Sequence, residues 1–198
     1  MIKNFYSLTT LLLLIVFLYY THSVKKSITS MEENLNHTRV RYHHLLDSLT
    51  NLFDKKLDEY HNILDSLPLG SPLDTIVVAS DFGTRRSPIS GKWQRHAGVD
   101  LQGTYWDTVY STGTGKVVMS SWNAGYGKCV EIKHIGGYTS KYAHLSRIWV
   151  KKGDVVNNGD PIGKCGRTGS VTGQHLHYEV SRNQELTDPL PYIFVLSK

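Results

Sequence analysis

Hydrophobic residues follow three patterns along this chain, each typical of a different kind of structure. The first is a continuous apolar segment, since no Lys, Arg, Asp or Glu occurs from Asn4 to Val24. At about 1.5 Å per residue, a helix of this length would span about 31 Å, close to the ~30 Å of hydrocarbon in a bilayer. We therefore predict a transmembrane signal-anchor over residues 1–24.

A cleaved signal peptide is the alternative for this segment, because its strongest apolar run, Leu11–Leu18, is short enough to be one. Thr21-His-Ser23 is a poor version of the small-residue cleavage site that a signal peptide needs, which favours an uncleaved anchor. Lys3 on one side and Lys25 and Lys26 on the other leave the orientation weakly determined.

The second pattern covers residues 28–67 and has the three- and four-residue spacing of a helix. One register contains Ile28, Met31, Leu35, Tyr42, Leu45, Leu49 and Leu52, and a second contains Phe53, Leu57, Tyr60, Leu64 and Leu67. We predict a helical stalk over residues 25–67. It could be a dimeric coiled coil with a stutter, half of a helical hairpin, or an amphipathic helix lying on the following domain. Pro68 and Pro72 then begin a linker over residues 68–79.

The third pattern consists of short apolar or alternating runs between turn signals, which is typical of β-strands. The expected strands are residues 75–78, 99–101, 108–110, 115–120, 128–134, 138–144, 161–165 and 175–180. The intervals between them are too short for repeated crossover helices, which excludes a parallel α/β sheet. We predict an all-β domain over residues 80–198, built as an antiparallel sheet or sandwich and long enough to bury one core.

Charge divides the chain in the same way. Residues 1–71 contain 7 basic and 7 acidic residues, whereas residues 72–198 contain 15 and 10, a net charge of +5. The β-domain should therefore be attracted to an anionic polymer. The charge is modest for this length and no nucleic-acid motif accompanies it, so we predict no nucleic-acid partner. Cys129 and Cys165 could form a disulfide outside the cytoplasm or remain two buried thiols.

Four of the ten histidines lie in three short segments of the predicted β-domain: Arg95-His-Ala-Gly-Val-Asp100, Tyr142-Ala-His-Leu-Ser146 and Thr172-Gly-Gln-His-Leu-His-Tyr-Glu179. His175 and His177 are two residues apart in an expected strand, so both imidazoles project from one face. Imidazole and carboxylate groups are normal zinc ligands, and a catalytic zinc typically takes three. With His96, Asp100 and His144 there are five candidate groups, which leaves imidazoles for proton transfer.

Each motif would be weak alone, because an H-x-H pair could be a solvated strand face. The four-residue spacing of His96 and Asp100 could likewise reflect an ordinary ion pair. His134 is interpreted as a hydrogen-bonded structural residue, and most histidines of the N-terminal third as solvated helix residues. Together, in this order and with glycine-rich connections, the three motifs predict a metal-assisted hydrolase.

From about Ser80 to Tyr192 the sequence resembles the lysostaphin/LytM-type zinc endopeptidases, which cleave peptide cross-links in bacterial cell walls. The matching motifs are Ser80-Asp-Phe-Gly-Thr-Arg85, His96-Ala-Gly-Val-Asp100, Gly125-Tyr-Gly127, Tyr142-Ala-His-Leu-Ser146, Lys152-Gly-Asp154 and residues 166–179. The resemblance implies that His96, Asp100 and His177 bind one zinc ion and that His144 and His175 are catalytic. It also implies an open groove, whose loops we expect at residues 85–93, 122–125 and 166–169.

Zinc in such a site would lower the pKa of a bound water toward ~7, where a histidine can remove its remaining proton. One of His144 and His175 is expected to act as general base, while the other holds the water or steadies the developing oxyanion. Glu179 could orient an imidazole or could be an ordinary solvated carboxylate.

We therefore expect a membrane-anchored zinc endopeptidase that acts on the stem peptides of peptidoglycan. Its substrate would place the β-domain in the periplasm, with the anchor in the inner membrane. The alternative is a non-catalytic LytM-like adaptor that binds or activates another wall hydrolase, and the intact ligand set favours the enzyme. A masked enzyme, with the stalk or residues 85–95 covering the zinc, would combine the two. The stalk could also support a homodimer or bind a regulator.

Overall fold

The computed structural model describes residues 2–87 and 89–193, in which a long helix precedes a β-domain. The helix, α1 (Ile2–Asp65), is continuous through the predicted anchor and most of the predicted stalk. It ends two residues before Leu67, which precedes Pro68 and is therefore disfavoured in the helical conformation. The chain divides into two compact units at Leu57 and Asp58, so the last turns of α1 belong to the same unit as the β-domain.

The β-domain is built from antiparallel strands, as the sequence predicts. The main sheet has the order β1 (Val78–Ser80), β4 (Val99–Gln102), β12 (His175–Arg182), β8 (Tyr138–Leu145), β7 (Gly127–Lys133), β6 (Gly115–Asn123) and β10 (Val155–Val156), and β13 (Glu185–Thr187) also pairs with β12. A second sheet has the order β5 (Thr108–Tyr110), β11 (Pro161–Lys164) and β9 (Arg147–Ile148). The remaining elements are the hairpin of β2 (Gly83–Arg86) and β3 (Trp93–His96), the 3₁₀ turn η1 (Ile135–Gly137) and α2 (Leu190–Ile193).

Two segments differ locally from the expectation. The strand expected at residues 75–78 begins only at Val78, and the ends of the segment expected as a groove loop belong to strands, Arg85 and Arg86 to β2 and Trp93 to β3. Leu73, in the segment assigned to a linker, is buried in the core, and the backbone amide of Gly70 donates to the carbonyl of Thr112. Residues 70–77 therefore pack on the β-domain.

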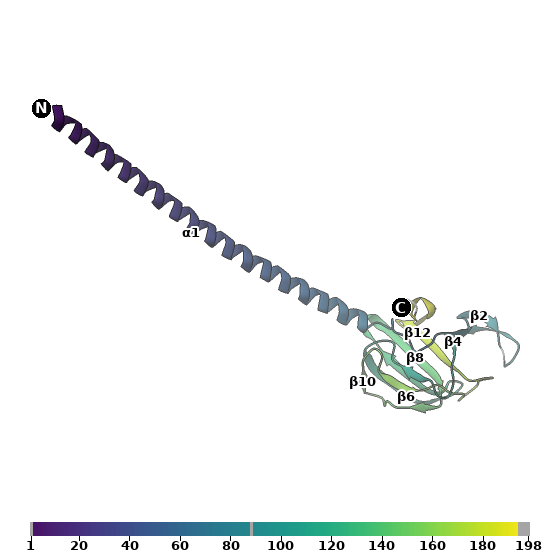
Figure 1. The fold of residues 1–198 in the computed structure, drawn as a ribbon. Helices are drawn as coiled ribbons and strands as arrows, with labels where there is room; N and C mark the ends of the chain where they lie inside the picture. The colour runs from purple at the N-terminus through teal and green to yellow at the C-terminus, as the bar shows by residue number, and fades with distance from the viewer. Residues whose placement is uncertain (1, 88, 194–198) are drawn as a thin grey trace. The chain divides into compact units, whose positions relative to one another are not determined.

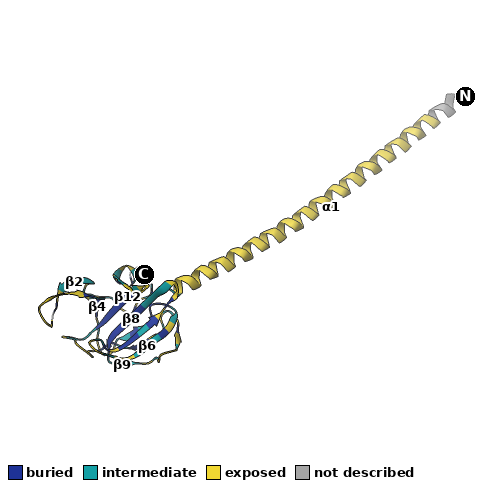
Figure 2. Ribbon diagram, turned by 180° about the vertical axis from the view of Figure 1, so that it is seen from behind, coloured by how far each residue is buried: buried dark blue, intermediate teal, exposed yellow. Residues whose placement is uncertain are grey.

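One face of the main sheet covers the hydrophobic core, and strand alternation decides which residues it contains. In β12, Leu176, Tyr178 and Val180 are fully buried on this face, while the residues between them point to the other face. Val99 and Leu101 of β4 join the same core. The central strands are dark blue in Figure 2, which marks them as buried. The core thus holds β4, β8 and β12 in fixed register, and these strands supply much of the candidate site.

A buried chain of hydroxyl groups lies on the core side of the same strands. Thr112 Oγ1 is 2.9 Å from the hydroxyls of both Tyr142 and Tyr178. Ser140 Oγ donates to the Tyr142 hydroxyl at 3.0 Å and lies 2.7 Å from His134 Nε2. His134 is therefore a hydrogen-bonded structural residue, as the sequence predicts. Its pKa is lowered by burial, although the Thr114 carbonyl that it contacts acts in the opposite direction.

Both cysteines are buried free thiols, which resolves the alternative that the sequence left open. Burial raises the pKa of Cys165 to about 11. A thiol with such a pKa is protonated near neutral pH and is a poor nucleophile.

Candidate metal centre and active-site cleft

The turn between β3 and β4 brings His96 and Asp100 to one point. Gly98 lies in this turn, and a Cβ atom there would be 2.1 Å from the carbonyl oxygen of Tyr178. Only glycine lets the chain pass so close to β12 without displacing backbone. The register of β4 and β12 then places Asp100 directly opposite His177.

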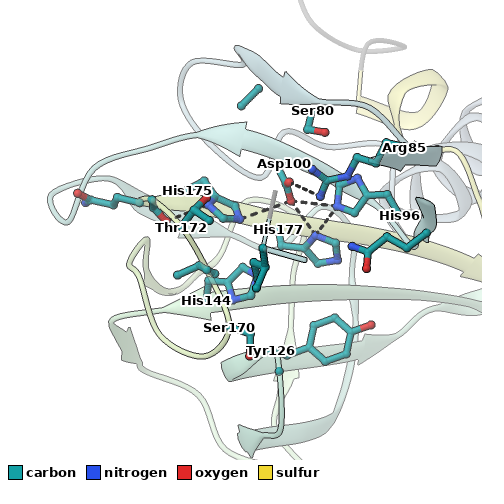
Figure 3. Close-up of a pocket in the computed structure, with 17 residues that line it drawn as sticks. Ser80, Arg85, His96, Asp100, Tyr126, His144, Ser170, Thr172, His175 and His177 are labelled. Atoms are coloured by element: carbon teal, nitrogen blue, oxygen red, sulfur yellow. Dashed lines mark hydrogen bonds and ion pairs between the residues drawn. The ribbon is translucent and has the colours of Figure 1, made fainter. Parts of the chain in front are cut away.

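Three side-chain atoms from these residues converge. Asp100 Oδ1 is 3.1 Å from His96 Nε2 and 2.9 Å from His177 Nδ1, and the two imidazole nitrogens are 3.1 Å apart. Figure 3 shows the three side chains pointing toward a common centre. Within the described residues, these three form the group of ligand-type side chains close enough to share one metal ion.

The outer nitrogen of each ligand histidine is already bonded. His96 Nδ1 is 2.7 Å from the carbonyl oxygen of Asp81, and His177 Nε2 is 2.9 Å from Glu179 Oε1. Since these oxygens can only accept, both outer nitrogens carry a proton, and each inner nitrogen can offer a lone pair to a metal ion. Burial would lower the pKa of His177, but its bonds to Asp100 and Glu179 raise it, so while no cation is bound its inner nitrogen can carry a proton and donate to Asp100.

This donor set fits a zinc ion. A tetrahedral ion with bonds of about 2.0–2.1 Å would hold its ligand atoms about 3.3 Å apart, slightly more than the 2.9–3.1 Å observed. Burial opposes ionisation of Asp100, but hydrogen bonds from His177 and His96 outweigh it and hold the pKa of this carboxyl well below its usual range. The carboxylate is therefore charged and ready to bind a cation.

Glu179 is an orienting partner of His177, which decides between the two readings of the sequence. It is 3 % exposed and accepts a hydrogen bond from the hydroxyl of Tyr126 at 2.7 Å. Its other carboxylate oxygen is 3.2 Å from Lys141 Nζ. Burial opposes ionisation of Glu179, but the bond from His177 and the charge of Lys141 outweigh burial and lower its pKa.

His144 reaches the site through an unusual backbone conformation. Its φ is 61°, in the left-handed region that costs most residues about 1–2 kcal/mol. The His144 amide donates to the carbonyl of Tyr126, and Nδ1 lies 2.8 Å from the carbonyl of Thr168, so Nε2 is left unprotonated. Burial lowers the pKa of His144 to about 4, against a weaker opposing effect of the Thr168 carbonyl.

His175 lies beside the three converging residues, at the start of β12. Its Nε2 is 3.5 Å from Asp100 Oδ1, and its Nδ1 is 3.1 Å from the carbonyl of Gly173. The rings of His175 and His144 are 4.9 Å apart between centroids. Burial lowers the pKa of His175, while the charge of Asp100 acts in the opposite direction. The structure thus brings all five candidate residues together.

A cavity of about 490 Å³ opens beside these groups. The hairpin lines it with Arg85, Ile89 and Gln94, and Gly125 and Tyr126 also line it. Residues 166–169, expected as a groove loop, do not line it, but the adjacent residues 170–174 do. Figure 3 shows His144 and His175 beside the three converging residues.

Sequence reasoning missed three contributors to this site. Arg85, quoted as the end of a matching motif and as the edge of a loop but given no role, has Nη2 3.0 Å from Asp100 Oδ2. The carbonyls of Asp81 and Thr168 fix the tautomers of His96 and His144. A backbone carbonyl leaves no signal in side-chain identity, whereas Arg85 belongs to the motif Ser80-Asp-Phe-Gly-Thr-Arg85 on which the family resemblance already drew.

Comparison with known proteins points in one direction. A family model described as peptidase family M23 matches residues 94–189, which contain all five candidate residues. The peptidoglycan DD-endopeptidase ShyC of Vibrio cholerae is 44% identical over 112 residues, which are 56% of this chain and 26% of ShyC.

Solved structures of peptidases are also similar to this chain. The catalytic domain of the antimicrobial peptidase lysostaphin from Staphylococcus simulans superposes with a TM-score of 0.52 and 32% identity, covering 59% of this chain and 91% of that domain. A zinc-containing peptidase from Vibrio cholerae gives a TM-score of 0.53 and 33% identity, covering 62% of this chain and 38% of that one. The chain spans between a quarter and a third of the length of the first curated relatives that it matches.

Proposed function

The chain belongs to peptidase family M23, and on that premise we propose that it is a zinc endopeptidase that hydrolyses peptide cross-links of bacterial peptidoglycan. The observation that carries the proposal is the convergence of His96 Nε2, Asp100 Oδ1 and His177 Nδ1, each 2.9–3.1 Å from the others. The outer nitrogens of His96 and His177 are hydrogen-bonded to other groups of the chain, and the cleft opens beside the three residues. A catalytic metal requires this arrangement.

Zinc bound there would supply a Lewis acid that polarises the scissile carbonyl and acidifies water. The chain's own residues would move the protons. His144 and His175 each present an unprotonated Nε2, because their Nδ1 atoms donate to the carbonyls of Thr168 and Gly173. Burial lowers the pKa of both imidazoles, so each is neutral near pH 7 and able to accept a proton.

We assign one of these histidines the role of general base toward the attacking water. The other would steady the charge that develops on the carbonyl oxygen. The protonated base would then donate its proton to the leaving amine. Tyr126 and the hairpin residue Gln94 line the same cleft and would contact the peptide on either side of the bond.

The bond we propose is the direct cross-link between D-alanine and a diamino acid. ShyC and ShyA of Vibrio cholerae, both named peptidoglycan DD-endopeptidases, support this choice by their similarity to residues of the β-domain. The net charge of +5 over residues 72–198 suits a substrate rich in carboxylates.

We further propose that the first part of α1 anchors the enzyme in the inner membrane and leaves the β-domain in the periplasm. α1 contains a stretch long and apolar enough to cross a membrane, although a signal sequence would meet the same criterion. The remainder of α1 would act as a stalk. Its apolar residues, including Leu45, Leu49 and Leu52, are exposed, so a second copy or a regulator could cover them.

A non-catalytic adaptor is the less favoured alternative. An adaptor needs no metal, so the convergence of three ligands and of the groups that orient them would serve no purpose in it. The left-handed conformation of His144 costs free energy, and such strain is typically found where a function requires the position of the side chain.

The test uses the full chain, purified in detergent micelles and loaded with zinc. Incubation with a defined cross-linked muropeptide dimer should release two monomers, identified by mass and by one new amine. A chelator should abolish cleavage, and zinc should restore it. His177→Ala should bind no stoichiometric zinc and should show no cleavage.

His61→Ala is the matched control, because it removes an exposed imidazole from α1 and should leave zinc content and turnover unchanged. Stoichiometric zinc in the wild-type chain without cleavage of any muropeptide dimer would overturn the enzymatic proposal and favour the adaptor.

A further inference from the structure

The two carboxylate oxygens of Asp100 have different partners. Oδ1 faces the centre, where it contacts His96, His177 and, at 3.5 Å, His175. Oδ2 points away and forms an ion pair with Arg85 Nη2 at 3.0 Å. The carboxylate is therefore divided between the centre and a single guanidinium group, which Figure 3 also shows.

The β2–β3 hairpin places Arg85 for this contact. Arg85 pairs with Gln94 across β2 and β3, and Gly83 pairs with His96 in the same register. Arg85 and His96 thus come from the two strands of one hairpin. The Arg85 side chain is 25 % exposed and its Nε is buried without a hydrogen-bond partner, so ordering it has a cost that a purely solvated arginine would avoid.

Two opposing physical effects follow from a guanidinium beside a metal ligand. Its positive charge repels a cation at the centre and weakens the carboxylate as a donor. Its hydrogen bond fixes the orientation of the carboxylate, and outer partners of this kind typically change metal affinity by about 10–100-fold. The guanidinium is held on Oδ2, the oxygen remote from the centre, which reduces the first effect and preserves the second.

We propose that Arg85 is a positioning residue that holds Oδ2 of Asp100, so that Oδ1 alone is presented to the metal. The inference rests on the proposed zinc site and adds to it a residue that binds neither metal nor water. Without Arg85, the carboxylate is free to rotate and to offer both oxygens, which spoils the three-donor arrangement.

The test measures the zinc dissociation constant of the full chain by competition with a chromophoric chelator. Arg85→Ala should raise this constant about 10–100-fold. Arg85→Lys keeps the charge but lacks the planar fork, so it should give an intermediate value. Arg86→Ala is the matched control, because the next side chain along β2 is exposed, and it should leave the constant within about twofold of wild type, well below the effect of an orienting partner.

Folding of each variant is checked by urea unfolding, followed by tryptophan fluorescence, before zinc is measured. An Arg85→Ala variant that is folded and binds zinc as tightly as the wild type, or more tightly, would show that charge repulsion dominates and would overturn the inference. Unchanged zinc affinity with a raised KM would assign Arg85 to the substrate, with the same consequence. A wild-type chain that binds no zinc would contradict the proposed function together with this inference.

Discussion

The two faces of β12 are built from alternate residues of one strand, yet they are stabilised in different ways. Leu176, Tyr178 and Val180 are fully buried in the core, where removal of apolar surface from water provides the stabilisation. His177 and Glu179 are also buried, at 5 % and 3 % exposed, but they are polar and are retained because each hydrogen-bonds to another fixed group. One face therefore provides stability, and the other maintains a geometry.

The largest effect should come from the polar face. His175→Ala should lower kcat about 10²–10⁴-fold, because it removes a group proposed to transfer a proton. The His175 side chain is 16 % exposed and makes one backbone contact through Nδ1, so the free energy of unfolding should change by less than about 1 kcal/mol. Turnover of a muropeptide dimer measures kcat, urea unfolding measures the free energy of unfolding, and zinc content shows whether the metal site is intact. Loss of zinc along with activity would contradict the separate role assigned to His175.

The adjacent residue should behave in the opposite way. Leu176→Ala leaves a cavity in the core and should lower the free energy of unfolding by about 2–5 kcal/mol. Turnover per folded molecule should stay within a few-fold of wild type, because the side chain points away from the cleft. Urea unfolding followed by tryptophan fluorescence reports on the β-domain alone, since all four tryptophans lie outside α1.

Leu176→Met is the milder control, because it nearly preserves volume and should cost less than about 1.5 kcal/mol. If turnover per folded molecule falls in both variants as it does in His175→Ala, the two faces of β12 are not separable.

A smaller effect on the free energy of unfolding is expected at His144, whose proposed function requires a backbone conformation that lowers stability. The positive φ of His144 is easier for glycine than for alanine, so His144→Gly should be more stable than His144→Ala by about 1 kcal/mol. Both variants should lose activity to the same extent, since neither has an imidazole. The conformational contribution is isolated by comparing urea midpoints of the two.

Ala143 supplies the reverse comparison. It lies in the same strand, is fully buried and does not have a positive φ, so Ala143→Gly should be destabilising by about 0.5–1 kcal/mol. Equal stability of the His144→Gly and His144→Ala variants would mean that the backbone at 144 stores no strain.

The sequence predicted strands well where hydrophobic periodicity is strong. The strand expected at residues 108–110 is β5, and those expected at 138–144 and 175–180 lie within β8 and β12. The β2–β3 hairpin was missed because Gly83-Thr-Arg-Arg86 and Trp93-Gln-Arg-His96 contain little apolar alternation. Their pairing depends on register and on contacts with the rest of the domain, which a local pattern does not encode.

The candidate site was predicted at the level of residue types and not of orientation. Spacing alone indicated that His175 and His177 share a face. Family resemblance supplied the division into ligands and catalytic residues, and the five side chains do meet. Glu179, two residues from His177, was already a candidate for orienting an imidazole. The other partners, namely Arg85 and the carbonyls of Asp81 and Thr168, come from segments distant in sequence from the residues that they fix. Only the folded chain brings these partners to the site.

The smallest predicted effect tests whether the core face also contains a proton-sensitive group. His134 is buried on that side, and burial lowers its pKa from the ordinary 6.5, so the folded state favours the neutral ring. Below pH 6.5 the unfolded chain binds a proton that the folded chain rejects, and stability is lost as the pH falls toward the lowered value. His134→Gln removes this contribution, so its urea midpoint should decline less than that of the wild type between pH 7 and pH 5. His144 and His175 titrate in both proteins and cancel in the difference. Parallel declines would show that the Ser140 and Thr114 contacts stabilise His134 equally in both protonation states.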